Sequence, residues 1–234
     1  MIPEIICHIM GAVDGRLLPS RWTPPFDGTP SGELFAEYAA LGKLLGADAW
    51  MFGKATTREM FPGKFVGGDG RHPRAPKVFA GRRDSERLFI TVDPEADINF
   101  TSGTLRGDNI VVVVGLNATE GYLARLEELG ISYIVMADPS DLRGAMKILG
   151  REFGVRRVSL QGGGIIDGAM LAAGLISELS LVVYPGIDGL ASAPSIFEYQ
   201  GGEGIRPAAG QSLELLSAEV RAHGVVWLRY RFHH

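Results

Sequence analysis

The chain contains a single cysteine, Cys7, and this scarcity excludes several kinds of protein. One thiol cannot form an intrachain disulfide, so the chain is not a small disulfide-stapled domain. One thiol also cannot supply a zinc deaminase centre, which needs a His-x-Glu and a Pro-Cys-x-x-Cys motif. The rest of the sequence shows no cluster of metal-ligating residues, and we predict no metal site. Cys7 lies in the apolar run 5–10 and is predicted to be a buried core thiol.

Long apolar runs and basic segments are also missing. No run of about 18 apolar residues is present, so a membrane partner is not expected. The first residues, Met1-Ile2-Pro3-Glu4, lack the features of a signal peptide, and we expect a cytoplasmic protein. The formal net charge is −4 and no basic run occurs, which argues against nucleic acid as a partner.

The 234 residues are 46% hydrophobic, which is enough for one large folded domain over residues 1–234. Apolar strand-like runs alternate with segments of helical periodicity, and the last two runs, 212–221 and 225–232, predict a hairpin. Leu34, Tyr38, Leu41 and Leu45 share one face of a helix that Thr29 and Pro30 are expected to begin. The pattern predicts a three-layer α/β fold: a mixed, mostly parallel sheet with helices on both faces and a C-terminal antiparallel hairpin.

The most informative stretch is Gln161-Gly162-Gly163-Gly164-Ile165-Ile166-Asp167-Gly168, which lies between a strand-like and a helix-like run. Three glycines at such a switch let backbone N–H groups approach a ligand without a Cβ in the way. The start of a helix presents unpaired donors and positive dipole charge, which suit a phosphate. The stretch therefore predicts a nucleotide site.

Two further polar stretches follow strand-like runs: Gly53-Lys54-Ala55-Thr56-Thr57 and Gly81-Arg82-Arg83. Because ligands of open α/β sheets bind beyond the carboxyl ends of the strands, we expect all three stretches at such ends. The hydroxyls of Thr56 and Thr57 and nearby N–H groups would hold one phosphate of a dinucleotide. Gly162, Gly163 and Gly164 would hold another part of it.

The paired arginines suggest which dinucleotide this is. Arg82 and Arg83 could bind a 2′-phosphate, because the guanidinium fork matches phosphate geometry, and this favours NADP over NAD. The Rossmann fingerprint G-x-G-x-x-G is absent after the first strand, where the chain reads Gly11-Ala12-Val13-Asp14-Gly15. The fold is therefore expected to differ from the standard dinucleotide-binding domain.

Five segments in order resemble one known family. Ala12-Val13-Asp14-Gly15-Arg16 resembles the element S-x-D-G-[KR], and Ala47-Asp48-Ala49-Trp50-Met51-Phe52-Gly53-Lys54-Ala55-Thr56 resembles A-D-A-x-x-x-G-[RK]-x-T. The pattern x-E-G-G-G is similar to Leu160-Gln161-Gly162-Gly163-Gly164. The pattern L-x-x-G-L-[VI]-D-E-L is similar to Leu171-Ala172-Ala173-Gly174-Leu175-Ile176-Ser177-Glu178-Leu179. The pattern x-P-x-x-x-G is similar to Tyr184-Pro185-Gly186-Ile187-Asp188-Gly189. The family is that of the riboflavin-pathway pyrimidine reductases, and the resemblance covers nearly the whole chain.

The resemblance implies a dihydrofolate-reductase-like fold and an NADPH-dependent reductase that is often a homodimer. The implied small-molecule substrate is a ribosylaminopyrimidine phosphate, as in the 5-amino-6-(5-phosphoribosylamino)uracil reductase reaction. By position, Gly53, Lys54, Thr56 and Thr57 and the loop of Gly162, Gly163 and Gly164 would contact the cofactor. Asp14, placed near the nicotinamide end, would face the substrate as the catalytic residue.

The chain departs from the family pattern at three positions. Ala12 stands where the family has serine, Gln161 where it has glutamate, and Ser177 where it has aspartate. The first two remove polar groups near the reacting centre, so two alternatives stay open. One is a reductase of a different small substrate, and the other is a non-catalytic nucleotide- or ligand-binding protein on the same fold. A true dihydrofolate reductase is disfavoured, because no clear acid-bearing pterin site is recognised.

Overall fold

The computed structural model describes residues 1–68, 70–202 and 204–234. Residue contacts divide the chain into two units, each built from segments that are distant in sequence. The first unit comprises Met1–Pro3 and Asp48–Val158, and the second comprises Glu4–Ala47 and Ser159–His234. The strand β8 (Arg157–Leu160) begins in the first unit and ends in the second. The prediction of a single domain over residues 1–234 stays a prediction.

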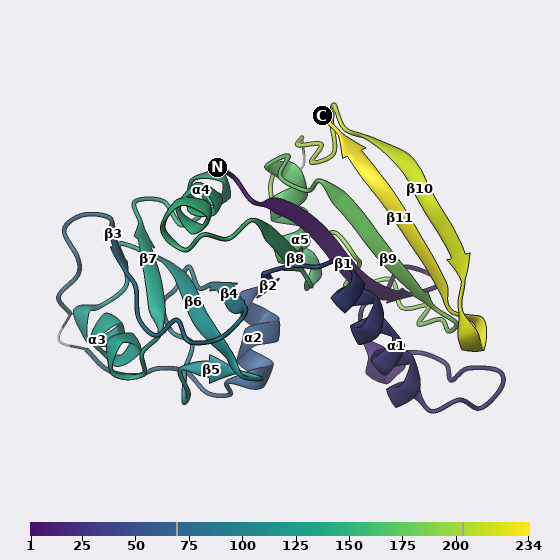
Figure 1. Cartoon of the computed structure of the whole chain (residues 1–234), viewed down its shortest axis with the longest axis horizontal. Coiled ribbons are helices and arrows are strands. Elements are labelled where there is room, and N and C mark those ends of the chain that lie inside the picture. Colours follow the sequence, from purple (N-terminus) through teal and green to yellow (C-terminus); the bar gives the residue numbers. More distant parts are fainter. Residues whose placement is uncertain (69, 203) are drawn as a thin grey trace. The chain divides into compact units, whose positions relative to one another are not determined.

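The first unit contains a sheet with the strand order β2-β4-β6-β7-β3 (Figure 1). The strands β2 (Ala49–Phe52), β4 (Leu88–Val92), β6 (Asp108–Gly115) and β7 (Ser132–Met136) run parallel. The strand β3 (Lys77–Phe79) pairs with β7 in the antiparallel sense, and the short β5 (Thr104–Leu105) does so with β6. The predicted mixed, mostly parallel sheet is confirmed.

Helices explain why these strands are apolar on both faces. Helix α3 (Glu120–Glu128) contributes Tyr122, Leu123 and Leu126 to a core that also contains Val112 and Val114 of β6. The alternate residues of β6 are equally buried, on the face where α4 (Leu142–Glu152) packs. A sheet covered on both sides needs continuous β-branched runs rather than alternation, as β6 shows. Helix α2 (Lys54–Met60) follows β2.

The second unit contains a sheet with the strand order β10-β11-β9-β1. The strands β1 (Glu4–Ala12) and β9 (Glu178–Tyr184) are parallel. The strands β11 (Val226–His233) and β10 (Ser212–Val220) form the predicted antiparallel hairpin beside β9. The hairpin turn is the short 3₁₀ segment η2 (Ala222–Gly224), and a second such segment, η1 (Pro19–Arg21), follows β1.

Helix α1 (Ser31–Leu44) covers one face of this sheet. Leu34 and Leu41 of this helix and its C-cap residue Leu45 pack with Tyr38 as the helical spacing predicts, against apolar residues of β1, β9 and β11. The helix begins one position later than expected, because Pro30 is its N-cap and Ser31 its first residue. Helix α5 (Gly164–Ala172) follows the glycine stretch, as predicted. Within the described residues, no helix is long and apolar enough to cross a membrane.

Candidate functional site

The start of α2 is formed by Gly53, which caps the helix directly after β2. The Thr57 hydroxyl is buried, donates to the Gly53 carbonyl at 3.0 Å and lies 2.9 Å from the Thr91 hydroxyl. These contacts fix the turn between strand and helix. Thr57 therefore holds the backbone in place, and its hydroxyl already has partners inside the protein.

Thr56 differs from its neighbour. Its side chain is half-buried and makes no hydrogen bond to the described residues. It lies in the first turn of α2, where the N–H groups of a helix have no partner within the helix. The Thr56 hydroxyl and these N–H groups are donors of the kind that a phosphate needs.

The Lys54 side chain lies among carboxylates. Its ammonium is 2.6 Å from Asp93 Oδ1, 2.6 Å from Asp97 Oδ1, and also bonds to Glu95. Burial disfavours the charged ammonium, but hydrogen bonds from it to Asp93, Asp97 and Glu95 raise the pKa of Lys54. The three carboxylates could also hold a metal ion, and Lys54 supplies the positive charge there. The Lys54 side chain thus anchors the start of α2, and only its backbone N–H remains for a ligand.

Arg82 and Arg83 follow β3, but β3 runs against the other strands. Its carboxyl end therefore lies where the parallel strands begin, at the opposite edge of this sheet from Gly53. The expectation that the Gly81-Arg82-Arg83 stretch shares an edge with the start of α2 is wrong for this reason. The Arg82 N–H donates to the Gly130 carbonyl, just before β7.

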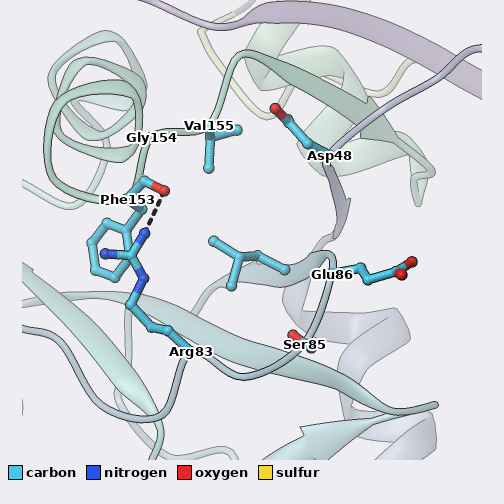
Figure 2. Close-up of a pocket in the computed structure, with 8 residues that line it drawn as sticks. Asp48, Arg83, Ser85, Glu86, Phe153, Gly154 and Val155 are labelled. Atoms are coloured by element: carbon cyan, nitrogen blue, oxygen red, sulfur yellow. Dashed lines mark hydrogen bonds between the residues drawn. The ribbon is translucent and has the colours of Figure 1, made fainter.

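Arg83 has structural partners of its own. Its guanidinium donates to the carbonyls of Glu152 (3.1 Å) and Phe153 (2.6 Å) at the end of α4, and it lies 5.3 Å from the centre of the Phe153 ring. Figure 2 shows this contact at the wall of a small cavity of about 170 Å³, with Asp48 and Ser85 opposite. A guanidinium that satisfies the last carbonyls of a helix stabilises the helix end.

In the second unit, the glycine stretch caps α5. Gly162 has a φ of +85°, which favours glycine, and Gly163 is the N-cap with an ordinary φ of −72°. A Cβ on Gly164 would lie 2.2 Å from the Ser195 carbonyl oxygen. The third glycine is therefore required by a neighbouring segment, residues 193–199, whose Glu198 N–H also donates to the Gly164 carbonyl.

The Asp14 carboxylate accepts hydrogen bonds from the Gly189 N–H at 2.7 Å and the Asp188 N–H at 3.5 Å. The bond from Gly189 keeps the pKa of Asp14 below its ordinary value, so this exposed carboxyl is ionised at neutral pH. It ties the turn after β1 to the turn after β9. Because β1 and β9 are parallel, both turns lie at the carboxyl edge of the pair.

Residues 193–199 bring the Asp14 turn and the start of α5 into one region of the second unit. The Leu17 N–H donates to the Pro194 carbonyl, and Arg16 and Ser195 form an isolated antiparallel β-bridge. The Glu198 N–H donates to the Gly164 carbonyl. The sequence reasoning missed this segment and also missed Asp167, which is fully buried in α5. An aspartate in an otherwise apolar helical run was the available signal.

The three residues that depart from the family pattern, Ala12, Gln161 and Ser177, are either buried or hydrogen-bonded within the second unit. Ala12 is buried at the end of β1, and the Gln161 amide donates to the Ser159 hydroxyl at 3.1 Å. Ser177 lies before β9, and its hydroxyl accepts from the Ile5 N–H at 3.4 Å. Gln161 and Ser177 therefore have partners within the second unit.

The chain matches the family described as the RibD C-terminal domain over residues 3–227, and it belongs to that family. Solved structures share the fold at low identity. A pyrimidine reductase-like protein from Corynebacterium diphtheriae superposes with a TM-score of 0.67 at 18% identity, covering 99% of this chain and 92% of that one.

Two further structures extend the comparison. RibD of Acinetobacter baumannii gives a TM-score of 0.61 at 16% identity, and this chain covers 58% of its length. The riboflavin biosynthesis reductase of Saccharomyces cerevisiae gives a TM-score of 0.60 at 14% identity, over 99% of this chain and 90% of that one. At identities this low, the superpositions establish a shared fold and nothing more specific.

Proposed function

We propose that this protein is an NADPH-dependent reductase of the riboflavin-pathway pyrimidine reductase type. The observation that carries the proposal is a pair of glycine-capped helix starts, each within three residues of the end of a strand, in a member of the RibD C-terminal domain family. Such helix starts bind phosphate groups. When bound, NADPH would supply the hydride, and the protein's own groups would bind and orient the reactants.

The cofactor contacts follow from the groups that remain available. We propose that the Thr56 hydroxyl and the backbone of Gly53 and Lys54 bind one phosphate, with Thr57 fixing the turn behind them. The backbone of Gly162, Gly163 and Gly164 would bind the cofactor at α5. The 2′-phosphate role of Arg82 and Arg83 stays a prediction, and the contacts of Arg83 with α4 do not support it.

The substrate side rests on Asp14. We propose that its ionised carboxylate faces the substrate, a ribosylaminopyrimidine phosphate or a similar heterocycle, in a cytoplasmic enzyme. Ala12 and Gln161 favour a second candidate, a ligand-binding protein without turnover, because both remove polar groups that the family pattern carries. NADPH binding without oxidation across pyrimidine and pterin substrates would select that candidate, and turnover of any of them would exclude it.

Gly163→Asp is expected to abolish NADPH binding. The backbone at Gly163 has an ordinary φ that other residues also adopt, and aspartate there places a negative charge where the phosphate would bind. In a thermal-shift titration, saturating NADPH at about 100 times its dissociation constant should stabilise the wild type by about 2.7 kcal/mol. NADH should stabilise it less, and neither cofactor should shift Gly163→Asp.

Gly32→Asp is the matched control for this variant. Gly32 is also in the first turn of a helix, α1, and a Cβ there meets no atom within 4 Å. The control should bind NADPH like the wild type. Unchanged NADPH binding by Gly163→Asp would show that the cofactor assignment at α5 is wrong.

We also propose a homodimer that forms through one face of the β9–β11–β10 sheet, called here the apolar face. The face opposite α1 carries Leu181 and Val183 of β9, Val226, Leu228 and Tyr230 of β11, and Leu213, Leu215, Ala218 and Val220 of β10. None of these side chains is charged. Their exposure is greatest on β10, where Leu215 is 54% and Val220 84% exposed. The face on the α1 side instead carries ion pairs such as Arg229–Glu178.

A second copy of the chain fits this face best. A nine-residue strand spans roughly 30 Å, so the apolar face has the dimensions of one layer of a β-sandwich. A face without charges is complementary to itself, as a two-fold dimer requires. An uncovered apolar surface of this extent on a monomer marks an interaction site.

Leu215→Glu is expected to convert the dimer into monomers, because it places a charge inside the apolar face. Light scattering after size exclusion should give about twice 25.2 kDa for the wild type and a single chain mass for the variant. Ser212→Glu, on the polar face of the same strand, should remain a dimer. A wild-type protein of single chain mass at all concentrations would overturn the proposal.

A further inference from the structure

Asp167 has no evident structural role for its charge. It lies in the first turns of α5 and is fully buried, and no nitrogen or oxygen of the described residues hydrogen-bonds to either carboxyl oxygen; only the weakly donating Cys7 thiol stabilises its charge. Its Oδ2 is 3.4 Å from the position that a Cβ on Gly162 would take. The carboxyl therefore lies directly beneath the first glycine of the loop that caps α5. A buried polar group without a partner calls for an explanation.

The surroundings of Asp167 disfavour its ionised form. Two titratable groups among the described residues interact electrostatically with Asp167, the Cys7 thiol of β1 and the Tyr38 hydroxyl of α1. The Tyr38 hydroxyl donates to the His8 carbonyl. The carboxylate of Glu198, in the segment that packs on α5, accepts the Ser195 N–H. Within the described part of the chain, no cation pairs with Asp167. Burial raises the pKa of Asp167 well above its ordinary value, and the Cys7 thiol opposes this only in part.

An anion at the start of α5 would act on the same carboxyl. The N-terminal dipole charge of a helix stabilises one nearby negative charge, and two would repel each other in a water-poor setting. A phosphate bound to the backbone of Gly162, Gly163 and Gly164 therefore disfavours ionised Asp167. By linkage, ionised Asp167 disfavours the phosphate by the same factor.

We propose that Asp167 couples proton uptake to anion binding at the start of α5, so that the loop binds a phosphate group while Asp167 is neutral and loses affinity when Asp167 ionises. The ligand group is the diphosphate of a dinucleotide or a free pyrophosphate. This inference rests on the proposed phosphate-binding role of the loop. Asp167 acts through the electrostatic repulsion between its carboxylate and an anion bound to the loop, so it is a positioning residue and not a catalytic one.

The test is the dissociation constant of NADPH for wild type and Asp167→Asn between pH 5 and pH 9. Wild-type affinity should weaken by about tenfold or more as Asp167 ionises, within the usual range of coupling between sites. The two proteins should bind equally at pH 5, and Asp167→Asn should bind more tightly at pH 9. Because both proteins are compared at each pH, the titration of NADPH itself cancels from the ratio. A merely structural role predicts weaker binding by the variant at every pH.

Two further variants sharpen the result. Cys7→Ala removes the thiol that favours the carboxylate, so its loss of affinity should begin at a higher pH than in the wild type. Asp84→Asn removes an exposed carboxylate in the first unit and should follow the wild-type profile. Parallel profiles for wild type and Asp167→Asn would overturn the proposal.

Folding provides an independent readout. A carboxyl whose pKa is raised by folding contributes stability that is fully present below its unfolded pKa of about 3.9 and is lost as pH rises through the folded value. Asp167→Asn should therefore have a higher Tm than the wild type at pH 9, and no advantage at pH 9 would count against the inference. If wild type binds no NADPH, the proposed function fails, and inorganic pyrophosphate replaces it as the probe. The same divergence with pyrophosphate would support the coupling, and absence of binding would overturn it too.

Discussion

Replacing Lys54 by methionine is expected to lower the free energy of unfolding by about 3–5 kcal/mol, the range measured when one partner of a buried ion pair is removed. Asp93 is fully buried, and its Oδ2 already accepts from the Asp97 and Ile98 N–H groups and the Tyr122 hydroxyl. Its Oδ1 faces the Lys54 ammonium. The variant leaves that oxygen buried without a cation, and urea denaturation at pH 7 measures the cost.

The pH dependence of this loss has a definite sign. Burial opposes ionisation of Asp97, but hydrogen bonds from Lys54 and Lys64 outweigh it and lower the pKa of Asp97 to about 2. The stability that Asp97 contributes is therefore present above about pH 4, its unfolded pKa, and is lost as pH falls toward 2. The difference between wild type and Lys54→Met should shrink over the same range.

Lys64→Met is the matched control. Lys64 also pairs with Asp97, at 3.0 Å, but its side chain is 66% exposed. Exposed pairs contribute about 1 kcal/mol or less, so this variant should remain close to the wild type in stability. Equal losses from the two variants would contradict the view that Lys54 occupies the structural centre of the network.

Elements with a strong local pattern could be predicted from the sequence. The spacing of Leu34, Tyr38, Leu41 and Leu45 predicts one face of α1, and these residues do pack together. The alternation in residues 225–232 predicts β11, which forms a hairpin with β10. Both signals reside within a dozen residues, so no knowledge of distant partners is needed.

The direction of β3 could not be predicted in the same way. Its three residues carry no periodic signal, and its orientation is set by pairing with β7, more than fifty residues later in the chain. The edge at which Arg82 and Arg83 lie depends on that pairing alone. Likewise, the ion pairs of Lys54 come from residues 93–97 after another strand, which a motif around Lys54 does not reveal.

In the glycine stretch, one feature could be predicted from the sequence and another could not. The sequence predicts that it begins a helix, and α5 does begin at Gly164. The reason for two of its glycines is tertiary, because Gly164 and Gly168 lie against residues 193–199. A close approach between backbones has no signature near the glycine itself, so the packing of residues 193–199 against these two glycines could not be predicted from the sequence.

Gly168→Ala is expected to lower the free energy of unfolding by about 3 kcal/mol, at the upper end of the usual cost of overpacking. The added Cβ would lie 2.5 Å from the carbonyl carbon of Glu198 and 2.6 Å from the nitrogen of Tyr199. Both are backbone atoms, so no side chain can rotate away, and α5 must separate from residues 193–199. Thermal or urea denaturation of the variant measures the cost.

Gly32→Ala makes the same chemical change in another helix and should have the opposite sign. A Cβ on Gly32 meets no atom within 4 Å, so α1 gains the higher helix propensity of alanine, about 0.5–1 kcal/mol. The contrast separates steric contact from helix propensity. If Gly168→Ala were as stable as Gly32→Ala, residues 193–199 would not pack against α5 in solution, and their link between the Asp14 turn and the α5 loop would be lost with them.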